Sequence, residues 1–346
     1  MAFPEPLGYN MQMSLRASVD IGSNTIRLLI GAVENNGIRD VYSDRRITRL
    51  GNGVDRSGML QPENMKASFA VLREFAALIS SHGVKRVRAV ATSALREASN
   101  AGAFIQNVLD NTGISIEVIS GEKEALMVLH GILFSLQDAG QTMSAFSLPS
   151  LKKDFAGIFV LDMGGGSTEW VLHRKDPPVQ AGSIPVGVIK LAQRFIRSDP
   201  VSGNEIAELQ NEIGAVVAKL ASSIPDLTAG NIRLIGTAGT FTTLASLDMG
   251  LDTYVREKIH LHVIPLERLQ NMSRELLSLT LKERQKVKGL EPERADLIIP
   301  GLQFTIKFMD FFHFPVLTVS DYGLLEGAML GMEEEDAEDI SEARQP

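Results

Sequence analysis

Hydrophobic and polar positions alternate along the chain with two different periods. Short apolar runs that end in Gly, Ser or Asn predict strands, and longer segments with apolar residues three or four positions apart predict helices. The segment 61–82 places Leu72, Phe75 and Ile79 on one helical face and stops at Gly83. The predicted strands are 17–21, 26–33, 41–50, 84–92, 114–119, 159–163, 170–173, 232–235 and 317–320, and the predicted helices are 61–82, 101–111, 122–136, 187–197, 203–223, 240–248, 265–274, 280–286, 293–312 and 322–332.

The order of these elements predicts the fold class. Strands alternate with helices throughout, which is typical of an α/β protein in which helices cover mixed sheets. A chain of 346 residues is long enough for two domains. The segment 137–157 interrupts the alternation with Ser, Gly, Gln and Lys, and we interpret it as a long loop near the crossing between the domains.

Two turns in different halves of the chain repeat one sequence plan. Residues 19–25 read VDIGSNT, and residues 161–168 read LDMGGGST. Each segment has an aspartate at the end of a strand, glycine in the turn, a hydroxyl residue after it, and a second strand that follows. The recurrence indicates a duplicated structural unit.

Both turns have the composition of a phosphate-binding loop. Glycine lets the backbone approach a ligand closely, and successive backbone N–H groups in a turn form a concavity that binds anions. Either turn alone is more simply an ordinary hairpin, but their recurrence at matching places favours phosphate binding from two sides. The predicted phosphate ligands in the turns are Gly22, Ser23, Asn24, Thr25, Gly164, Gly165, Gly166, Ser167 and Thr168.

A carboxylate stands next to each turn. Asp20 and Asp162 cannot bind phosphate directly, because both groups are negative. A carboxylate beside a phosphate site is instead a typical ligand of Mg²⁺, which prefers carboxylate, water and phosphate oxygens. The sequence therefore predicts a magnesium site at Asp20 and Asp162.

Two further clusters supply a cation and an acid. Arg96 follows the predicted strand 84–92, and its planar guanidinium suits phosphate, although a surface arginine at a helix start is an equally good interpretation. Glu124 lies in the first turn of the helix 122–136, where a carboxylate also stabilises the helix dipole. A glutamate at that position that faces a phosphate cleft could act as a general base for an attacking water.

Composition excludes several other functions. The chain has no cysteine, which removes disulfides and thiolate catalysis and fits a reducing cytoplasm. It has neither a Gly-x-x-x-x-Gly-Lys loop nor a complete dinucleotide-binding glycine pattern. No apolar run is long enough to span a bilayer, and residues 1–13 lack the pattern of a signal peptide. We therefore expect a cytoplasmic protein with no membrane or nucleic-acid partner.

The net charge is −8, but it is unevenly distributed. Seven acidic residues and one arginine lie at or beyond Glu333, so six of the eight net negative charges belong to the C-terminal tail. The acidic balance therefore does not exclude a polyanionic substrate, because the field in a cleft is local. Basic side chains that could support such a ligand are Arg45, Arg46, Arg49, Lys85, Arg86 and Arg88.

Taken together, these segments resemble the exopolyphosphatase and guanosine pentaphosphate phosphatase family, from about Arg16 to Met332. Many ordered matches are far more specific than any one of them. The segments that carry the resemblance are 19–25, 91–96 with Asn100, 120–125, 162–169, Pro185 with Gly187, 236–240, 294–296 with Pro300 and Gly301, and 319–327. Two departures are Lys123, where many relatives have an acid, and Leu325, where an arginine is common.

The resemblance implies an actin-like fold of the short, two-domain type. Two ribonuclease-H-like domains would hold the active site in the cleft between them. The first would comprise residues 14–122 with 323–338, the second residues 123–322, and residues 1–13 and 339–346 would be loose termini. The final helix would return to the first domain.

The resemblance also implies roles for the candidate residues. Glu124 would be the general base that activates water, Asp20 and Asp162 would serve Mg²⁺, and the two turns with Arg96 would hold the phosphates. The substrate would be inorganic polyphosphate, with guanosine pentaphosphate as the alternative. A small-molecule kinase and a non-catalytic sensor of guanosine tetraphosphate, both on the same fold, are two rival interpretations, and a homodimer stays open.

Overall fold

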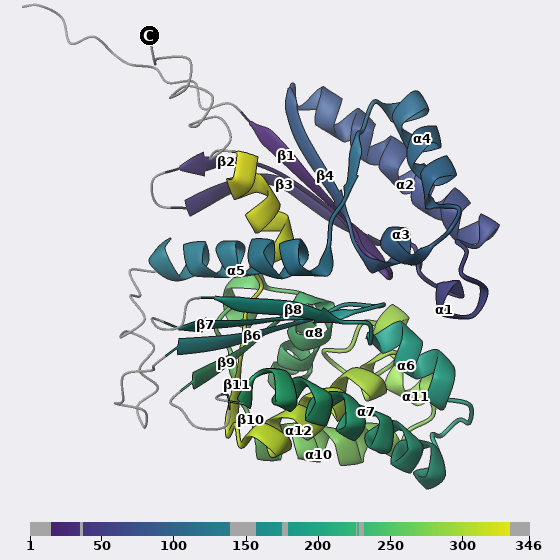
Figure 1. Ribbon diagram of the computed structural model, residues 1–346, viewed down its shortest axis with the longest axis vertical. Coiled ribbons are helices and arrows are strands. Elements are labelled where there is room, and N and C mark those ends of the chain that lie inside the picture. The colour runs from purple at the N-terminus through teal and green to yellow at the C-terminus, as the bar shows by residue number, and fades with distance from the viewer. Residues whose placement is uncertain are drawn as a thin grey trace, which may run out of the picture.

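The computed structural model describes residues 15–34, 37–138, 157–174, 179–225, 227 and 232–332. The predicted loose arm 1–13, most of the predicted loop 137–157 and the acidic tail lie outside the described residues. The described chain forms two mixed sheets, one above the other, and helices cover both (Figure 1). This arrangement confirms the predicted α/β class.

The first sheet has the strand order β3-β2-β1-β4-β5. Strand β1 pairs antiparallel with β2 and parallel with β4, so the predicted hairpin lies at the centre of the sheet. Its strands are β1 (Arg16–Ile21), β2 (Thr25–Glu34), β3 (Gly37–Ile47), β4 (Arg86–Ala91) and β5 (Ile116–Val118), and its helices are α1 (Val54–Ser57), α2 (Pro62–Ser81), α3 (Ser93–Glu97) and α4 (Ala101–Thr112).

The second sheet has the order β10-β11-β9-β6-β7-β8. Strand β6 pairs antiparallel with β7 and parallel with β9, which repeats the arrangement around β1. Its strands are β6 (Gly157–Met163), β7 (Thr168–Arg174), β8 (Gln180–Ile184), β9 (Ile232–Thr237), β10 (Val263–Pro265) and β11 (Val316–Val319). Its helices are α6 (Val188–Phe195), α7 (Gly203–Ser223), α8 (Ala238–Met249), α9 (Arg256–Ile259), α10 (Leu266–Leu277), α11 (Leu281–Arg284), the 3₁₀ turn η2 (Pro292–Arg294) and α12 (Ile298–Phe312).

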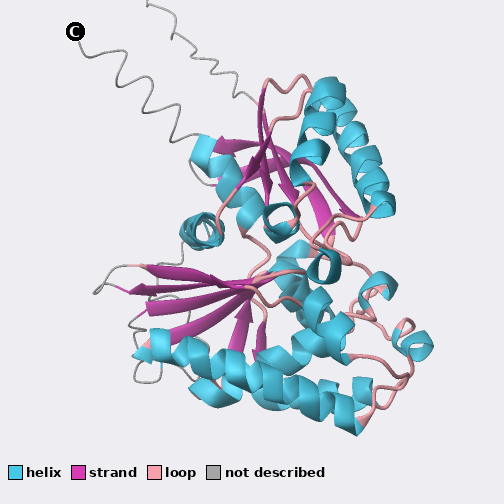
Figure 2. Ribbon diagram, turned by 45° about the vertical axis from the view of Figure 1, so that its right-hand side comes forward, coloured by secondary structure: helices cyan, strands magenta, loops and turns pink. Residues whose placement is uncertain are grey.

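Two helices lie between the sheets. Helix α5 (Gly121–Asp138) packs Val128 and Ile132 against Val160 and Ile235 of the second sheet, on the face opposite α7, α10 and α12 (Figures 1 and 2). The helix of residues 324–332 packs against Leu29 and its neighbours in the first sheet. We call the first sheet with α1–α4 and the helix 324–332 the first lobe, and the second sheet with α6–α12 the second lobe.

The structure differs from the predicted elements in several places. The strand predicted over 41–50 ends at Ile47, because the amides of Thr48 and Arg49 both donate to the carbonyl of Asn24 instead of to a neighbouring strand. The helix predicted over 293–312 begins at Ile298, after a separate 3₁₀ turn. Strands β8 and β10, which were not predicted, are short strands at the edges of the second sheet.

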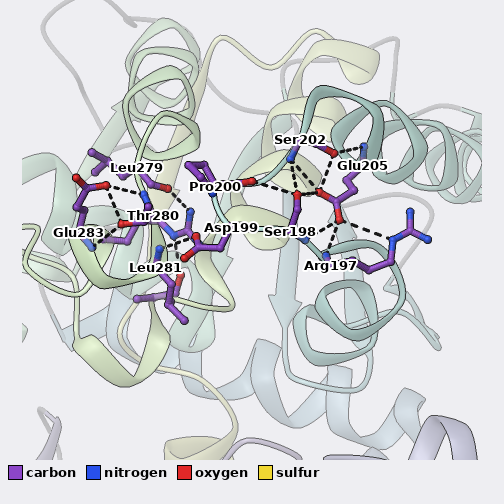
Figure 3. Close-up of polar contacts among 12 residues, drawn as sticks. Arg197, Ser198, Asp199, Pro200, Ser202, Glu205, Leu279, Thr280, Leu281 and Glu283 are labelled. Atoms are coloured by element: carbon purple, nitrogen blue, oxygen red, sulfur yellow. Dashed lines mark hydrogen bonds and ion pairs between the residues drawn. The ribbon is translucent and has the colours of Figure 1, made fainter.

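The outer end of the second lobe is fixed by two capping boxes (Figure 3). Ser202 and Glu205 cap the start of α7, and Thr280 and Glu283 cap α11. Between them, the carboxylate of Asp199 accepts a hydrogen bond from the amide of Leu281 at 2.7 Å. These bonds satisfy backbone groups that each helix start would otherwise leave unpaired.

The crossing of α5 with the helix 324–332 gives a test of the packing. A Cβ on Gly131 would overlap the carbonyl oxygen of Gly323 and lie 3.0 Å from the amide nitrogen of Gly327. We expect Gly131→Ala to lower the free energy of unfolding by about 1–3 kcal/mol, as overpacking usually does. The measurement is denaturant unfolding of the purified protein.

Gly102 of α4 is the matched control, because a Cβ there would have no heavy atom within 4 Å. Gly102→Ala should stabilise the protein by about 0.5–1 kcal/mol, since glycine weakens a helix. Equal effects of the two substitutions would contradict the close crossing.

Candidate active site

A cavity of about 670 Å³ lies between the lobes. Most of the predicted site residues line it, although they come from distant parts of the sequence. They are Asp20, Gly22, Ser23, Asn24, Thr25, Glu124, Asp162, Gly164, Gly165 and Ser167. Gly166, Thr168 and Arg96 do not line it, and their surroundings are described below.

The two predicted phosphate turns are closed in the same way. The amide of Gly22 donates to the carbonyl of Thr25 at 3.0 Å, and the amide of Gly164 donates to the carbonyl of Ser167 at 3.0 Å. Each turn therefore ends a central strand and begins its antiparallel neighbour. The two halves present equivalent turns to the cavity.

The two turns also touch each other. A Cβ on Gly166 would lie 2.8 Å from Ser23 Oγ, and a Cβ on Gly165 would lie 3.1 Å from Ser23 Cβ. Ser23 Oγ is in turn 2.8 Å from Ser93 Oγ at the start of α3. Glycine at positions 165 and 166 leaves room for this approach, and a Cβ there would also meet Ile189 at position 165 and Ser93 at position 166.

Thr168 uses its hydroxyl within the second lobe. Its Oγ1 donates to the carbonyl of Val186 at 2.6 Å, and the side chain is fully buried. Of the predicted hydroxyl ligands, Ser23, Thr25 and Ser167 line the cavity. The structure thus gives Thr168 a structural contact and leaves its predicted phosphate contact as a prediction.

Glu124 is a buried carboxyl group that faces the cavity from the first turn of α5. Only 6% of the residue is exposed. Burial raises the pKa of Glu124 well above its ordinary value, and the neighbouring carboxylates Glu169 and Asp162 raise it further, while Arg96 opposes the shift. A raised pKa brings a carboxyl group closer to the range in which it can exchange protons near neutral pH.

Arg96 contacts the candidate base rather than the cavity. Its Nη1 donates to Glu124 Oε2 at 3.1 Å and to the carbonyl of Ile119 at 2.9 Å, and its Nη2 lies 3.8 Å from Glu169 Oε1. The structure shows a guanidinium that orients Glu124 and favours its ionised form. The predicted phosphate contact of Arg96 stays a prediction.

Glu169 is a second buried carboxyl group, to which the sequence analysis assigned no role. Only 1% of it is exposed, Ser183 Oγ donates to its Oε1 at 2.6 Å, and its Oε2 is buried without a hydrogen-bond partner. Burial, followed by the charge of Asp162, raises the pKa of Glu169 to about 7. Its place directly after the second turn, where β7 begins, is the signal that could have identified it.

The two predicted metal ligands lie at the ends of β1 and β6. Arg27 donates to Asp20 Oδ2 through Nε at 2.8 Å and through Nη2 at 2.7 Å, while Asp20 Oδ1 is buried without a hydrogen-bond partner. Burial raises the pKa of Asp162 to about 6, against the opposing effect of Arg27. Asp20 and Arg27 are direct partners across the β1–β2 hairpin, so its register could have predicted their pairing.

These two aspartates fit a hydrated Mg²⁺. Asp20 has one oxygen in use and one free, and Asp162 lines the same cavity. Among the described residues, no three carboxylate or imidazole side chains gather into a metal cage. Mg²⁺ does not need such a cage, since it commonly binds one or two carboxylates together with water and substrate phosphates.

Further arginines line the cavity beyond the turns. Arg45 and Arg294 both contact Glu291, and Arg256 contacts Glu326 at 2.6 Å. The sequence analysis noted Arg45 only as general basic support and gave Arg294 no role. Their convergence depends on the packing of the two lobes.

Lys123, which stands beside Glu124 where many relatives have an acid, forms an ion pair with Glu117.

The fold and the cleft define a class of protein: a two-lobed α/β protein with two matching glycine turns and a buried carboxyl group in its central cavity. The described part of the chain contains no helix with the length and apolar character of a membrane span. The profile of the Ppx/GppA phosphatase family matches residues 29–145 and 147–336. The chain therefore belongs to the Ppx/GppA phosphatase family, which confirms the predicted family and its actin-like, two-domain fold.

Relatives with curated names agree with this assignment. Exopolyphosphatase 2 of Mycobacterium tuberculosis is 31% identical over 93% of this chain and 99% of its own length. A bifunctional 3-dehydroquinate synthase/phosphatase of Fusobacterium nucleatum is 32% identical over 91% of this chain, which spans 46% of that protein. These relatives support the predicted enzyme class, a hydrolase of phosphoanhydride bonds.

Solved structures of the family share the fold. The Aquifex aeolicus member superposes with a TM-score of 0.76 at 29% identity, covering 94% of this chain and 99% of that one. An exopolyphosphatase from Cytophaga hutchinsonii superposes with a TM-score of 0.80 at 25% identity, covering 93% and 98%. The two lobes are thus a shared feature of these proteins.

The buried carboxyl group of Glu169 gives a pH-dependent test. Because its pKa rises from 4.5 to about 7 in the folded protein, the folded state binds the proton more tightly, and ionisation destabilises the fold as pH rises through this range. Glu169→Gln removes that cost. We expect its free energy of unfolding to exceed that of the wild type by about 1–3 kcal/mol at pH 8, with the difference vanishing near pH 4.

Denaturant unfolding at several pH values measures this difference. Glu122→Gln is the control, because Glu122 lies in the same helical turn as Glu124 but is exposed. A stability difference for Glu169→Gln that does not change with pH would argue against a titrating buried carboxyl group.

Proposed function

We propose that this protein hydrolyses the terminal phosphoanhydride bond of inorganic polyphosphate and releases orthophosphate. The observation that carries the proposal is the placement of Glu124, a buried carboxyl group that opens into the same cavity as two glycine turns of matching geometry. Exopolyphosphatase 2 of Mycobacterium tuberculosis, which is similar over nearly the whole chain, supports the choice of substrate.

The proposed reaction is a direct attack of water on phosphorus. Glu124 accepts a proton from the water as the new P–O bond forms, and the bond to the leaving phosphate breaks. Arg96 keeps Glu124 oriented and favours its ionised form before the proton transfer. The backbone N–H groups of the two turns and the hydroxyls of Ser23 and Ser167 hold the terminal phosphoryl group. Positioning and charge stabilisation supply most of the rate in this type of reaction.

Asp20 and Asp162 would hold Mg²⁺ beside the turns, through Asp20 Oδ1 and the carboxylate of Asp162. The ion would neutralise phosphate charge when it is bound. Arg27 occupies the other oxygen of Asp20, so it fixes the orientation of that carboxylate. The cavity therefore combines fixed cations with two carboxylates that a divalent ion would share with the substrate.

Guanosine pentaphosphate is the second candidate substrate. The cavity extends beyond the phosphate turns to Gly239, Thr242 and Tyr254, so it has room for more than a phosphate chain. Tyr254 is 45% exposed, which leaves part of its ring open to a ligand. Both substrates end in the same phosphoanhydride, and the proposed chemistry is the same for each.

The first test is phosphate release, with Mg²⁺, from long-chain polyphosphate and from guanosine pentaphosphate in parallel. We expect release by the wild type and a loss of about 10²-fold or more in kcat for Glu124→Gln, because general-base catalysis typically contributes that much. Glu122→Gln should retain the wild-type rate, since Glu122 is exposed.

Each contrary outcome has a distinct meaning. Normal turnover by Glu124→Gln would remove the proposed base. Tight binding of guanosine tetraphosphate without phosphate release from either substrate would indicate a sensor. Phosphorylation of a small acceptor with ATP would indicate a kinase.

The proposed metal site gives a separate prediction. Asp162→Asn should raise the Mg²⁺ concentration required for half-maximal activity at least about tenfold, because the carboxylate charge is lost. Titration of activity with Mg²⁺ measures the shift. Asp310→Asn is the control, since Asp310 is exposed on α12. An unchanged Mg²⁺ requirement in Asp162→Asn would exclude Asp162 as a ligand.

A further inference from the structure

Lys190 and Glu97 form a paired contact between the lobes. Lys190 Nζ lies 2.9 Å from Glu97 Oε1 and 2.8 Å from Glu97 Oε2, so it contacts both carboxylate oxygens. Lys190 belongs to α6 of the second lobe, and Glu97 is the last residue of α3 in the first lobe. The contact therefore joins helices that are 93 residues apart in the sequence.

The two ends of this ion pair differ in their exposure to water. The side chain of Lys190 is 11% exposed, compared with 33% for Arg45, 37% for Arg49 and 24% for Arg256, whereas Glu97 is 33% exposed, close to the acidic partners of those pairs. Exposed ion pairs contribute little because water and salt screen them, and shielding strengthens the interaction. Because Lys190 is shielded and contacts both carboxylate oxygens of Glu97, the pair can help to fix the spacing of the lobes.

On its own side, Lys190 is rigidly connected to the second phosphate turn. The amide of Val188 donates to the carbonyl of Gly164 at 3.1 Å, and the amide of Ile189 donates to the carbonyl of Gly165 at 2.9 Å. Gly187, just before α6, lies so close to Gly165 that it has no room for a side chain. A shift of α6 would therefore move the turn with it.

On the other side, Glu97 belongs to the short helix α3 of the first lobe, whose side chains contact the first phosphate turn and Glu124. Helix α3 has only five residues and carries Ser93, which contacts Ser23 of the first turn, and Arg96, which contacts Glu124. So short a helix has few internal hydrogen bonds, and its position depends on such side-chain contacts. A contact at Glu97 therefore affects where Arg96 and Glu124 lie.

We propose that Lys190 and Glu97 are positioning residues, which hold the phosphate turn of the second lobe at its working distance from α3 of the first lobe, whose Arg96 contacts Glu124. Neither residue lines the cavity. The effect of this pair on catalysis rests on the proposed function, but its effect on the spacing of the lobes can be measured independently.

The first experiment is steady-state phosphate release by Lys190→Met. We expect kcat to fall about 10–100-fold, because a displacement of about 1 Å between reacting groups costs this much. KM should change less than about threefold, since the turns and arginines that bind the ground state are intact. Lys190→Arg and the exchanged pair Lys190→Glu with Glu97→Lys should each recover most of kcat.

Two further variants separate positioning from general stability. Arg194→Met is the matched control: Arg194 lies on the same helix, and it pairs with Glu212 within the second lobe, with 48% of its side chain exposed. It should keep the wild-type kcat. Glu97→Gln removes the other end of the pair at a partly exposed site and should lower kcat like Lys190→Met, even if the latter folds poorly.

The spacing of the lobes can be measured without activity. The chain has no cysteine, so Arg73→Cys on α2 and Lys219→Cys on α7 introduce unique sites for two spin labels, and both positions are exposed. We expect the distance distribution to broaden or shift in Lys190→Met and to match the wild type in Lys190→Arg. An unchanged distribution together with an unchanged kcat would overturn the proposal. Should the wild type release no phosphate, the proposed function fails, and the distance measurement alone decides on Lys190 and Glu97.

Discussion

The structure depends on the close approach of two glycine turns from different lobes. Ser23 of the first turn lies beside Gly165 and Gly166 of the second, and a side chain at either glycine would require neighbouring side chains to shift. Two helices pack between the sheets and hold the turns in place. Helix α5 packs against the second sheet, and the helix 324–332, which crosses α5 at Gly131, packs against the first.

The same approach concentrates negative charge. Asp20, Asp162, Glu124 and Glu169 are all buried, although ionised carboxylates are costly to bury. Arg27 offsets part of this cost at Asp20, and Arg96 does so at Glu124. The pKa values of Glu124, Glu169 and Asp162 are nevertheless raised, chiefly by burial. Buried carboxyl groups with raised pKa values are typical of active sites, where they serve reactivity but lower the stability of the fold.

Charged contacts join the lobes around this centre. Arg45 with Glu291, Arg49 with Asp296 and Arg256 with Asp40 are partly exposed. Lys190 with Glu97 lies beside the second phosphate turn, with Lys190 11% exposed. Exposed ion pairs are the ones that salt screens most. Arg45 and Arg256, which line the cavity, thus already have carboxylate partners.

The sequence by itself determined the features that local chemistry specifies. The repeated turns, the aspartates before them and Glu124 at a helix start are all visible within short segments, and the structure brings them to one cavity. The sequence did not indicate that Arg96 contacts Glu124, that Glu169 has a role, or that Lys190 pairs with Glu97. These features arise between elements that meet only when the sheets pack. Edge strands β8 and β10 were missed for a related reason: strands so short are stabilised by the neighbours they pair with rather than by their own composition. Local patterns thus identified most of the groups that line the cavity, and tertiary packing decided which groups touch, since burial and charge pairing act between residues far apart in the chain.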